Sequence, residues 1–385
     1  MHFSPFAWLV RCVTWMAGVG MLTLLLASGV TWRFDTALYD LHLRHWPYVP
    51  DNDLVIVAID SKSLAALGRW PWPRSVHARL IDRLGAAGVR DIGMDVTIPT
   101  ADTEHPENDQ LLAQAIRRNG KVVMPMFAEP ADLGGPLEEM LPVSPIAQSA
   151  AAIGHVDVAK DPDDLVRGAY LRAGLGRAYW PSLALALHQL HQPASHRKLP
   201  GMSDPDPGDA SPYLWMRDNY VLLRYAGAAG SFGRVSYSDV LDGNVPAELL
   251  KGRSVLVGAT AEGSGDIIQT PVSTMPGVEY QANIFESLQR GLLITPLGFL
   301  GQFLLGGGVL ALPLLLYGLP GFRRAWRAAL AAAMLVLILD LCLLRAAGLW
   351  WPPVGCLLVI GTGFIAWNLF TLRIASHDNG LARQA

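Results

Sequence analysis

The chain has 385 residues, of which 51% are hydrophobic and 16% are charged, and its formal net charge is −3. This near-neutral balance lacks the basic excess of nucleic-acid-binding proteins, which argues against nucleic acid as a partner. The three cysteines, Cys12, Cys342 and Cys356, lie in or beside apolar stretches at the two ends of the chain. The middle of the chain therefore has no cysteine for a disulfide or a metal site.

The first apolar stretch lies between Arg11 and Arg33 and is long enough to span a bilayer as a helix. Tryptophans near its ends suit anchoring at the membrane interface, namely Trp8, Trp15 and Trp32. The alternative is a cleaved signal peptide, because Ala27-Ser28-Gly29 has the small-residue pattern that signal peptidase recognises. Under both interpretations the segment that follows is exported.

The middle of the chain predicts an α/β domain with a mainly parallel sheet flanked by helices. Its first part alternates strands with helices, and a β-α-β-α-β pattern implies parallel strands joined by right-handed crossovers. The predicted strands are 53–60, 89–98 and 121–127, and the predicted helices are 75–87 and 109–118, with Asp109 as the N-cap of the second helix.

The later part of this domain is less regular. Two strands, 153–158 and 168–173, are predicted to be joined by an acidic turn at 161–164. A helix at 181–191 follows, and then a segment rich in Pro, Gly, Asp and Ser at 193–212 that predicts a mobile loop. Further strands are expected at 220–225 and 254–259, and a helix at 277–290 leads towards the second apolar stretch.

Three apolar stretches near the end of the chain complete a prediction of four transmembrane helices. They run over 297–317, 328–344 and from about 354 towards Arg373. The predicted organisation is therefore a cytoplasmic stub with helix 1 (1–33), an extracytoplasmic domain (34–295), three membrane helices (296–372) and a cytoplasmic tail (373–385).

Arginines in the short loops predict the orientation. The loop between the second and third stretches carries Arg323, Arg324 and Arg327, whereas the next loop carries only Arg345. Because loops rich in basic residues stay in the cytoplasm, both termini are expected to be cytoplasmic and the α/β domain extracytoplasmic. The expected location is the inner membrane of a bacterial cell, with several passes.

Short motifs in the middle domain resemble the CHASE2 family of bacterial extracellular sensory domains. The most specific is the run Gly68-Arg69-Trp70-Pro71-Trp72-Pro73-Arg74. Other similar stretches are spread over about residues 35–295, at 55–64, 93–96, Asp109 with Leu111, 154–158 with Asp161, Asp163 and Arg167, 180–184, 235–241, 255–260, 270–271 and 275–278. One apolar helix before the domain and three after it also match the family.

The resemblance implies a sensor. In that family the exported domain usually precedes a cytoplasmic output module, such as a histidine kinase, a nucleotide cyclase, a diguanylate cyclase or a protein kinase. This sequence ends about a dozen residues after the fourth apolar stretch. We therefore expect the output on a separate protein or on a part that this sequence lacks.

Two aspartates at strand ends are candidate ligand-binding residues. Asp60 ends the first strand and Asp95 lies near the end of the second; if the strands are neighbours, both carboxylates point into one cleft. Such a pair can hold a cation or the amino and hydroxyl groups of a ligand. The same cleft would be lined by Ser61, Ser63 and Thr97. The alternative is that each aspartate caps the backbone that follows it.

The loop after the first strand carries four further candidates: Arg69, Trp70, Trp72 and Arg74. Arginine forks suit carboxylate or phosphate groups, and tryptophan faces suit sugars or cations. The alternative is a structural loop, rigidified by Pro71 and Pro73, whose arginines form ion pairs within the domain.

Two polar segments are weaker candidates. The first contains His155 and the acidic residues Asp161, Asp163 and Asp164, whose spacing partly resembles a calcium loop. The glycine and the terminal glutamate of such a loop are absent, so a solvated turn is preferred and no metal is expected. The Gly-rich loop 262–265, followed by Asp266, either borders the ligand cleft or is a flexible turn.

Asp340 is the ionisable residue inside a predicted membrane span. A charge there is costly, so it is expected to face other helices; the alternative is a role in relaying a signal. The sequence contains no recognised catalytic motif, and we expect neither enzymatic activity nor a cofactor.

The favoured function is a membrane-bound sensor that relays an extracytoplasmic signal. Its expected partners are a small-molecule or periplasmic signal, the lipid bilayer, a cytoplasmic signalling protein and a second copy of the chain. Two alternatives stay open. One is a membrane-anchored extracytoplasmic enzyme using a metal at Asp60 and Asp95. The other is a scaffold whose helices recruit a partner through glycines at 306–308, 361 and 363.

Overall fold

The structure is a computed structural model that describes residues 5–131, 135–191, 199–203, 212–261, 263, 266–316 and 325–381. The chain forms two compact units. The α/β unit consists of residues 42–295, and the membrane unit combines residues 1–41 with residues 296–385.

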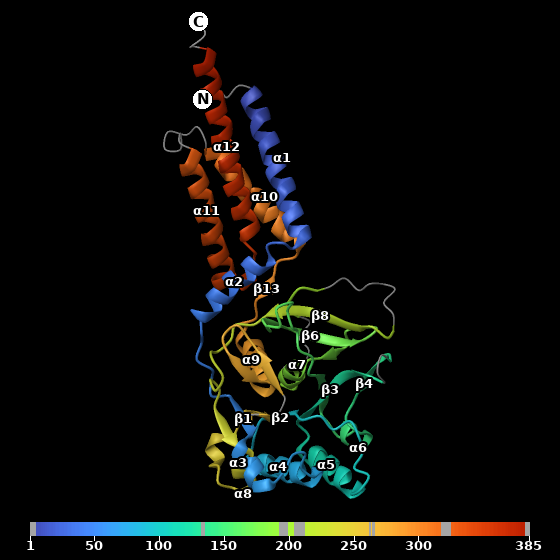
Figure 1. Ribbon diagram of the computed structural model, residues 1–385. Helices are drawn as coiled ribbons and strands as arrows, with labels where there is room; N and C mark the ends of the chain where they lie inside the picture. Colours follow the sequence, from blue (N-terminus) through green and yellow to red (C-terminus); the bar gives the residue numbers. More distant parts are fainter. Residues whose placement is uncertain are drawn as a thin grey trace. The chain divides into compact units, whose positions relative to one another are not determined.

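A seven-stranded sheet forms the centre of the α/β unit (Figure 1). Its strands are β1 Leu54–Ile59, β2 Asp91–Asp95, β3 Val122–Pro130, β4 Leu137–Met140, β5 Ala152–His155, β9 Arg234–Ser236 and β10 Ser254–Ala259. The order is β4-β3-β2-β10-β1-β9, with β5 paired to β3. The β3–β4 pair is antiparallel and the other pairs are parallel, which confirms a mainly parallel sheet.

Helices cover both faces of this sheet (Figure 1). The helices are α3 Ser61–Leu67, α4 Arg74–Ala86, α5 Pro106–Asn119, α6 Ser144–Ala147, α7 Leu183–Gln189, α8 Tyr237–Asp242 and α9 Gly277–Arg290, with the 3₁₀ turn η1 Ala247–Leu249. Alternation along β10 explains the two layers, because successive side chains point to opposite faces. Val255 and Val257 join the core with α4, α5 and α8, whereas Gly258 faces α9.

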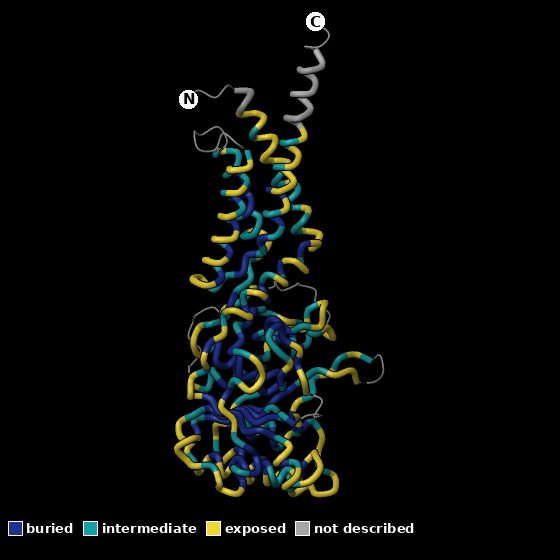
Figure 2. The backbone as a smooth tube through the Cα atoms, turned by 60° about the vertical axis from the view of Figure 1, so that its left-hand side comes forward, coloured by how far each residue is buried: buried dark blue, intermediate teal, exposed yellow. Residues whose placement is uncertain are grey.

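Smaller strands complete the α/β unit. A three-stranded antiparallel sheet has the order β7-β6-β8, from Trp180–Pro181, Gly168–Leu175 and Trp215–Leu222. An antiparallel pair, β11 Ile267–Gln269 with β12 Thr274–Pro276, leads directly into α9. In Figure 2 the strands at the centre of the unit are buried and its outer loops and helices are exposed.

The structure answers questions about strand order that the sequence left open. β1 and β2 are not neighbours, because β10 lies between them. The strands predicted at 153–158 and 168–173 belong to different sheets, as β5 and β6. The predicted mobile loop at 193–212 lies for the most part outside the described residues.

Asp109 does not cap its helix. The helix α5 begins earlier, at Pro106, after His105 as the N-cap residue. The buried Asp109 carboxylate instead accepts a hydrogen bond from the Asp102 backbone N–H and lies 2.6 Å from Arg74 Nε. Its place in the first turn still suits the helix dipole.

The membrane unit contains the long apolar helices. They are α1 Pro5–Ser28, α10 Phe299–Leu316, α11 Ala325–Cys342 with a π-helical end (η3) at Leu343–Ala347, and α12 Val354–Leu381; α2 Trp32–Arg44 and the short strands β13 Thr295–Pro296 and β14 Leu349–Trp350 accompany them. In the described chain, three helices are long and apolar enough to cross a membrane, at Trp8–Ser28, Phe299–Leu316 and Ala325–Ala347. The apolar part of α12, Val354–Leu369, is shorter.

These helices are apolar outside as well as inside, which is the pattern expected of a lipid-facing bundle. Exposed residues run along their length in Figure 2. Large exposed side chains on α1, α10 and α11 include Leu24, Leu300, Leu304, Leu330 and Met334. The interior is a separate core that includes Leu22, Leu310, Ala332, Val336 and Cys356.

Polar groups are placed on the inner side of this bundle. Asp340 is buried, as expected for a charged group that faces other helices. Asp35 on α2 is also buried, and its carboxylate accepts a hydrogen bond of 2.9 Å from the Val354 backbone N–H at the start of α12. Burial raises the pKa of Asp35, although the Val354 hydrogen bond opposes that shift.

The glycine run in α10 has one position that packing requires. A Cβ atom at Gly306 would lie 2.6 Å from Leu22 Cδ2 on α1 and 3.0 Å from Cys356 Sγ on α12, closer than real contacts allow. A Cβ at Gly308 would meet nothing within 4 Å, and the same holds for Gly361 and Gly363. Close helix packing therefore depends on Gly306 and not on the other glycines of the predicted set.

This difference gives a paired test. Gly306→Leu should lower the thermal unfolding temperature of the full chain in detergent, because overpacking a helix contact costs about 1–3 kcal/mol. Gly308→Leu adds the same side chain to open space and should leave that temperature nearly unchanged. Equal effects of the two substitutions would contradict the packing described here.

Candidate functional site

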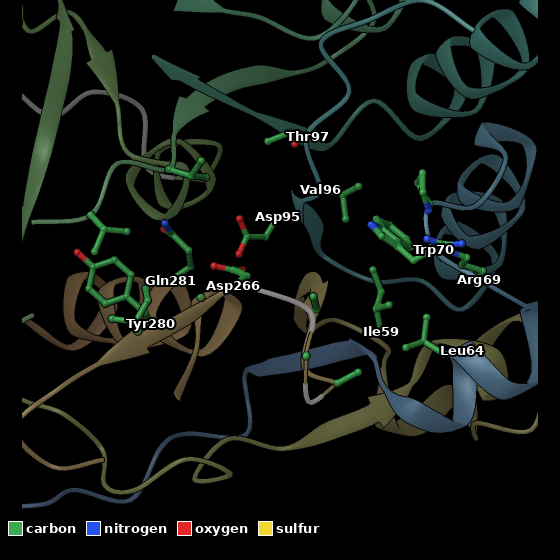
Figure 3. Close-up of a pocket in the computed structure, with 18 of the residues that line it drawn as sticks. Ile59, Leu64, Arg69, Trp70, Asp95, Val96, Thr97, Asp266, Tyr280 and Gln281 are labelled. Carbon is green, nitrogen blue, oxygen red and sulfur yellow. The ribbon is translucent and has the colours of Figure 1, made fainter. Parts of the chain in front are cut away.

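A pocket of about 660 Å³ opens at the carboxyl edge of the parallel sheet (Figure 3). The ends of three adjacent strands line it through Ile59 on β1, Asp95 on β2 and Ala259 on β10. Ligands of open α/β sheets bind outside the carboxyl ends of the strands, so this is where a binding site is expected.

The first turns of α9 close another side of the pocket. Gly277, Tyr280 and Gln281 line it. The helix approaches the sheet closely because Gly258 on β10 has no side chain: a Cβ there would lie 2.6 Å from Val278 Cβ and 3.2 Å from Asp95 Cβ. Gly277 is equally constrained, since a Cβ at this position would overlap both carboxylate oxygens of Asp266.

Two carboxylates meet in this pocket. Figure 3 shows Asp95 and Asp266 side by side, Asp95 from the end of β2 and Asp266 from the start of β11. Burial and the nearby Asp266 carboxylate raise the pKa of Asp95 to about 8. Burial also raises the pKa of Asp266, although part of that side chain reaches solvent. The pair therefore holds a proton near neutral pH.

Gln281 adds a third oxygen. Its side chain is 3% exposed and lines the pocket, and within the described chain its Oε1 atom has no hydrogen-bond partner. The neighbouring Tyr280 hydroxyl is already engaged, because it donates a hydrogen bond of 3.0 Å to the Gly168 carbonyl.

Arg69 and Trp70 line the other side of the pocket (Figure 3). Both are exposed. In Figure 3 Val96 and Ile59 lie between this side and the carboxylates, and Leu64 lies near Arg69; Ile268 also lines the pocket. The pocket thus combines an acidic end, an apolar middle and a basic, aromatic rim.

The sequence comparison identifies the domain that carries this pocket. The profile of the CHASE2 domain matches residues 16–317, which is most of the chain. The chain belongs to the CHASE2 family. Comparison with curated proteins and with solved structures found no match. CHASE2 is an extracellular sensor domain, and this agrees with an α/β unit that is joined to apolar helices.

The CHASE2 pocket does not include Asp60, and the Asp60–Asp95 pair, which required neighbouring strands, does not form; for Asp60 the alternative of a capping role is confirmed. β10 separates their two strands. The Asp60 carboxylate instead caps α3, accepting hydrogen bonds from the Ser63 backbone N–H (2.8 Å), the Ser63 hydroxyl (2.7 Å) and the Ser236 hydroxyl (2.9 Å). Burial opposes ionisation, but the hydrogen bonds from Ser63 and Ser236 outweigh it and lower the pKa of Asp60.

The Gly-Arg-Trp-Pro-Trp-Pro-Arg loop divides between the pocket and the core. Trp72 is 4% exposed and packs against Trp70, His77 and Tyr237, and its indole N–H donates to the Gly68 carbonyl. Arg74 turns towards α5, where it pairs with Asp109 and donates to the Thr100 carbonyl at 2.5 Å.

The acidic turn of the CHASE2 domain is organised around Arg167. This arginine is buried, and its guanidinium lies 2.7 Å from the Asp161 carboxylate and 2.8 Å from that of Asp163. His155 is buried at the end of β5, where burial lowers its pKa to about 4. Arg167 therefore forms an ion-pair cluster with Asp161 and Asp163, and the neutral His155 accepts a hydrogen bond from the Asp157 backbone N–H.

Among the predicted site residues, Arg69, Trp70, Asp95 and Thr97 line the pocket, whereas Asp60, Ser61, Ser63, Trp72 and Arg74 do not. Sequence reasoning named Asp266 only as a residue that follows a Gly-rich loop, and that loop does border the pocket through Gly263. It missed Gln281 altogether. A glutamine inside an otherwise buried helix was the available signal, because buried polar groups usually have partners.

The two arginines of the loop give a matched stability test. Arg74→Met should lower the free energy of unfolding by about 3 kcal/mol, because it leaves the buried Asp109 carboxylate without its cation. Arg69→Met removes an exposed charge and should change it by less than about 0.5 kcal/mol. Urea unfolding of the full chain, followed by tryptophan fluorescence, measures both values.

The raised pKa of Asp95 predicts how stability depends on pH. Between about pH 4 and pH 8 the folded state keeps a proton at Asp95 that the unfolded state has lost, so the free energy of unfolding falls as the pH rises through this window. Asp95→Asn should flatten that part of the profile. Asp242→Asn, at an exposed aspartate on α8, should leave the slope unchanged; a wild-type slope in Asp95→Asn would refute the assignment.

Proposed function

We propose that this protein is a membrane-bound sensor. A small ligand binds the pocket of the CHASE2 domain, and the resulting change is relayed across the inner membrane to a cytoplasmic output on another chain or on a part outside this sequence. One observation carries the proposal: α9 begins in the pocket, and its far end continues along the chain into the membrane helix α10.

The structure of α9 supports its role in a relay. Its buried residues run continuously from Gly277 to Ser287. Its polar side chains bond to the backbones of surrounding loops: Glu279 accepts from Gly230 and Ser231, Asn283 accepts from Ala226, and Glu286 accepts from Asp51. Because these hydrogen bonds hold the helix along its length, we expect it to move as a rigid unit and not to unfold locally.

The connection between the pocket and the membrane is short. The helix α9 ends at Arg290 with Gly291 as a left-handed C-cap, and α10 begins at Phe299. A ligand shifts such a connection only if it binds two arrangements of the domain with different affinities. Asp95 at the end of β2, Asp266 immediately before β11 and Gln281 on α9 come from different parts of the domain, so their separation would differ between arrangements.

The pocket chemistry favours binding over catalysis. Its described lining offers two carboxylates, an amide, the Arg69 guanidinium, the Thr97 hydroxyl and a phenol that already donates to Gly168. We propose that these groups hold a ligand and that the protein has no enzymatic activity of its own. Asp340, buried in the membrane unit, is a candidate for transmitting the change between helices.

We also propose a four-helix topology with α12 as the fourth span, both termini in the cytoplasm and the CHASE2 domain outside. The arginines after α10 support this orientation. With the native cysteines replaced by serine, Ala65→Cys on α3 should react with a membrane-impermeant maleimide in intact cells. Arg327→Cys on α11 should react only after permeabilisation; labelling of both, or the reverse pattern, would contradict the topology.

The relay is tested by filling the pocket with a side chain. Thr97 is exposed and lines the pocket, so Thr97→Trp can occupy it without crowding the core. Hydrogen exchange of the full chain in lipid nanodiscs should then change in the pocket, in the first turns of α9 and in residues 291–305. Thr100→Trp, at an exposed threonine outside the pocket lining, is the control. A change confined to the pocket would reject a relay.

A further inference from the structure

The acidic end of the pocket has an excess of hydrogen-bond acceptors. Among the described residues, no hydrogen-bond donor reaches the carboxylates of Asp95 and Asp266, whereas Asp157 accepts hydrogen bonds from Arg217 and Asp60 accepts them from Ser63. Asp266 is exposed and Asp95 is partly buried, so both carboxylates are accessible from the pocket and leave acceptor positions that a donor from outside the chain can fill.

Gln281 is an independent sign of the same ligand. Its side chain is 97% buried, it faces the pocket beside the carboxylates (Figure 3), and its Oε1 atom lacks a donor within the described chain. Three other buried polar side chains of α9 are satisfied, since Glu279, Asn283 and Glu286 each accept backbone N–H bonds. At the end of α9 that lines the pocket, the buried side-chain acceptor without a donor is Gln281 Oε1.

We propose that Asp95, Asp266 and Gln281 form a recognition site for a primary ammonium group, and that the ligand of this sensor is a small organic amine with an apolar body. An ammonium group has three N–H donors and no acceptor, which matches three oxygen atoms from three side chains. The inference rests on the proposed function, because it names the ligand class of the same pocket.

Charge favours an ammonium ion over a divalent metal. Asp95 keeps its proton near neutral pH, so the pair carries about one negative charge, which one ammonium ion balances. The described residues contain no group of three acidic, histidine or cysteine side chains suited to a metal ion. An anionic group is disfavoured at this end, because the Asp266 carboxylate already covers the start of α9 at Gly277.

The remainder of the pocket suits the rest of such a molecule. Leu64, Val96 and Ile268 offer apolar surface, and Trp70 lies beside Arg69 at the other side of the pocket. Two sources share this chemistry: a simple amine, and an amino acid whose carboxylate would reach Arg69. They differ in whether Arg69 contributes to binding.

Calorimetry of the full chain in nanodiscs tests the proposal with probes of one shape. Phenethylamine should bind about 10- to 100-fold more tightly than 2-phenylethanol, which lacks the charge, and than phenethyltrimethylammonium, which keeps the charge but has no N–H donor. Methylamine and cadaverine extend the panel to amines with other carbon skeletons. Phenylalanine differs from phenethylamine by its carboxylate; if it binds more tightly and Arg69→Gln removes that gain, the natural ligand is of the amino-acid type.

Variants locate the site. Asp95→Asn, Asp266→Asn and Gln281→Met should each weaken phenethylamine binding by about tenfold or more, whereas Asp242→Asn should not. Gln281→Met also removes the unsatisfied oxygen, so its thermal stability should be kept or increased, and this separates lost binding from misfolding. Equal affinity for the amine and the quaternary ion, or no binding by any amine of the panel, would overturn the proposal.

Failure of the ligand class is distinguishable from failure of the sensor function. If no amine binds while Thr97→Trp still alters exchange in α10, only the ammonium site is rejected. If phenethylamine binds as expected while exchange in residues 291–305 stays unchanged, the ammonium site stands and the relay is rejected.

Discussion

The close packing of α9 on the carboxyl end of β10 is the constraint on which the pocket depends. Gly258 lets Val278 approach the sheet, and Gly277 leaves room for the Asp266 carboxylate at the start of the helix. Without these two glycines the helix would be displaced, and Asp95, Asp266 and Gln281 would separate. The chain continues from the other end of α9 to α10. The proposed recognition and the proposed relay therefore both involve α9.

Much of the fold could be predicted from local sequence. Apolar runs identified β1 and β10, and the bounds expected for α9 agree with the structure. The order of the strands could not be predicted, because β10 enters between β1 and β2 from about 160 residues further along the chain, and no local pattern encodes that insertion. The candidate site depended on the same strand order, because a pair of Asp95 with Asp60 required β1 and β2 to be neighbours; Asp95 lies beside Asp266 instead.

The candidate site shows the same limit. Arg69 and Arg74 are five positions apart, yet Arg69 lines the pocket and Arg74 forms an internal ion pair. Residue type alone could not distinguish these two roles. Asp60 has the strand-end position of a ligand-binding residue, yet hydroxyl and backbone donors from Ser63 and Ser236 satisfy it. Whether a carboxylate is free to bind a ligand depends on donors brought by tertiary structure, and these are not visible in a motif.

The membrane unit obeys different physics from the α/β unit. Its helices expose leucines and other apolar side chains, and they approach one another where a small residue permits it, at Gly306. The buried Asp35 and Asp340 are exceptions, and Asp35 is explained by the N–H of Val354 at the start of α12. Polar caps of this kind join helices that apolar packing alone would hold loosely.

The most direct test of coupling between the pocket and the membrane helices is a distance measurement by pulsed electron paramagnetic resonance. Spin labels at Ala65→Cys on α3 and Leu300→Cys on α10, in a chain without native cysteines, report on both units in nanodiscs. Coupling predicts that saturating phenethylamine shifts the distance distribution and that Asp95→Asn abolishes the shift. Identical distributions with and without bound phenethylamine would contradict it.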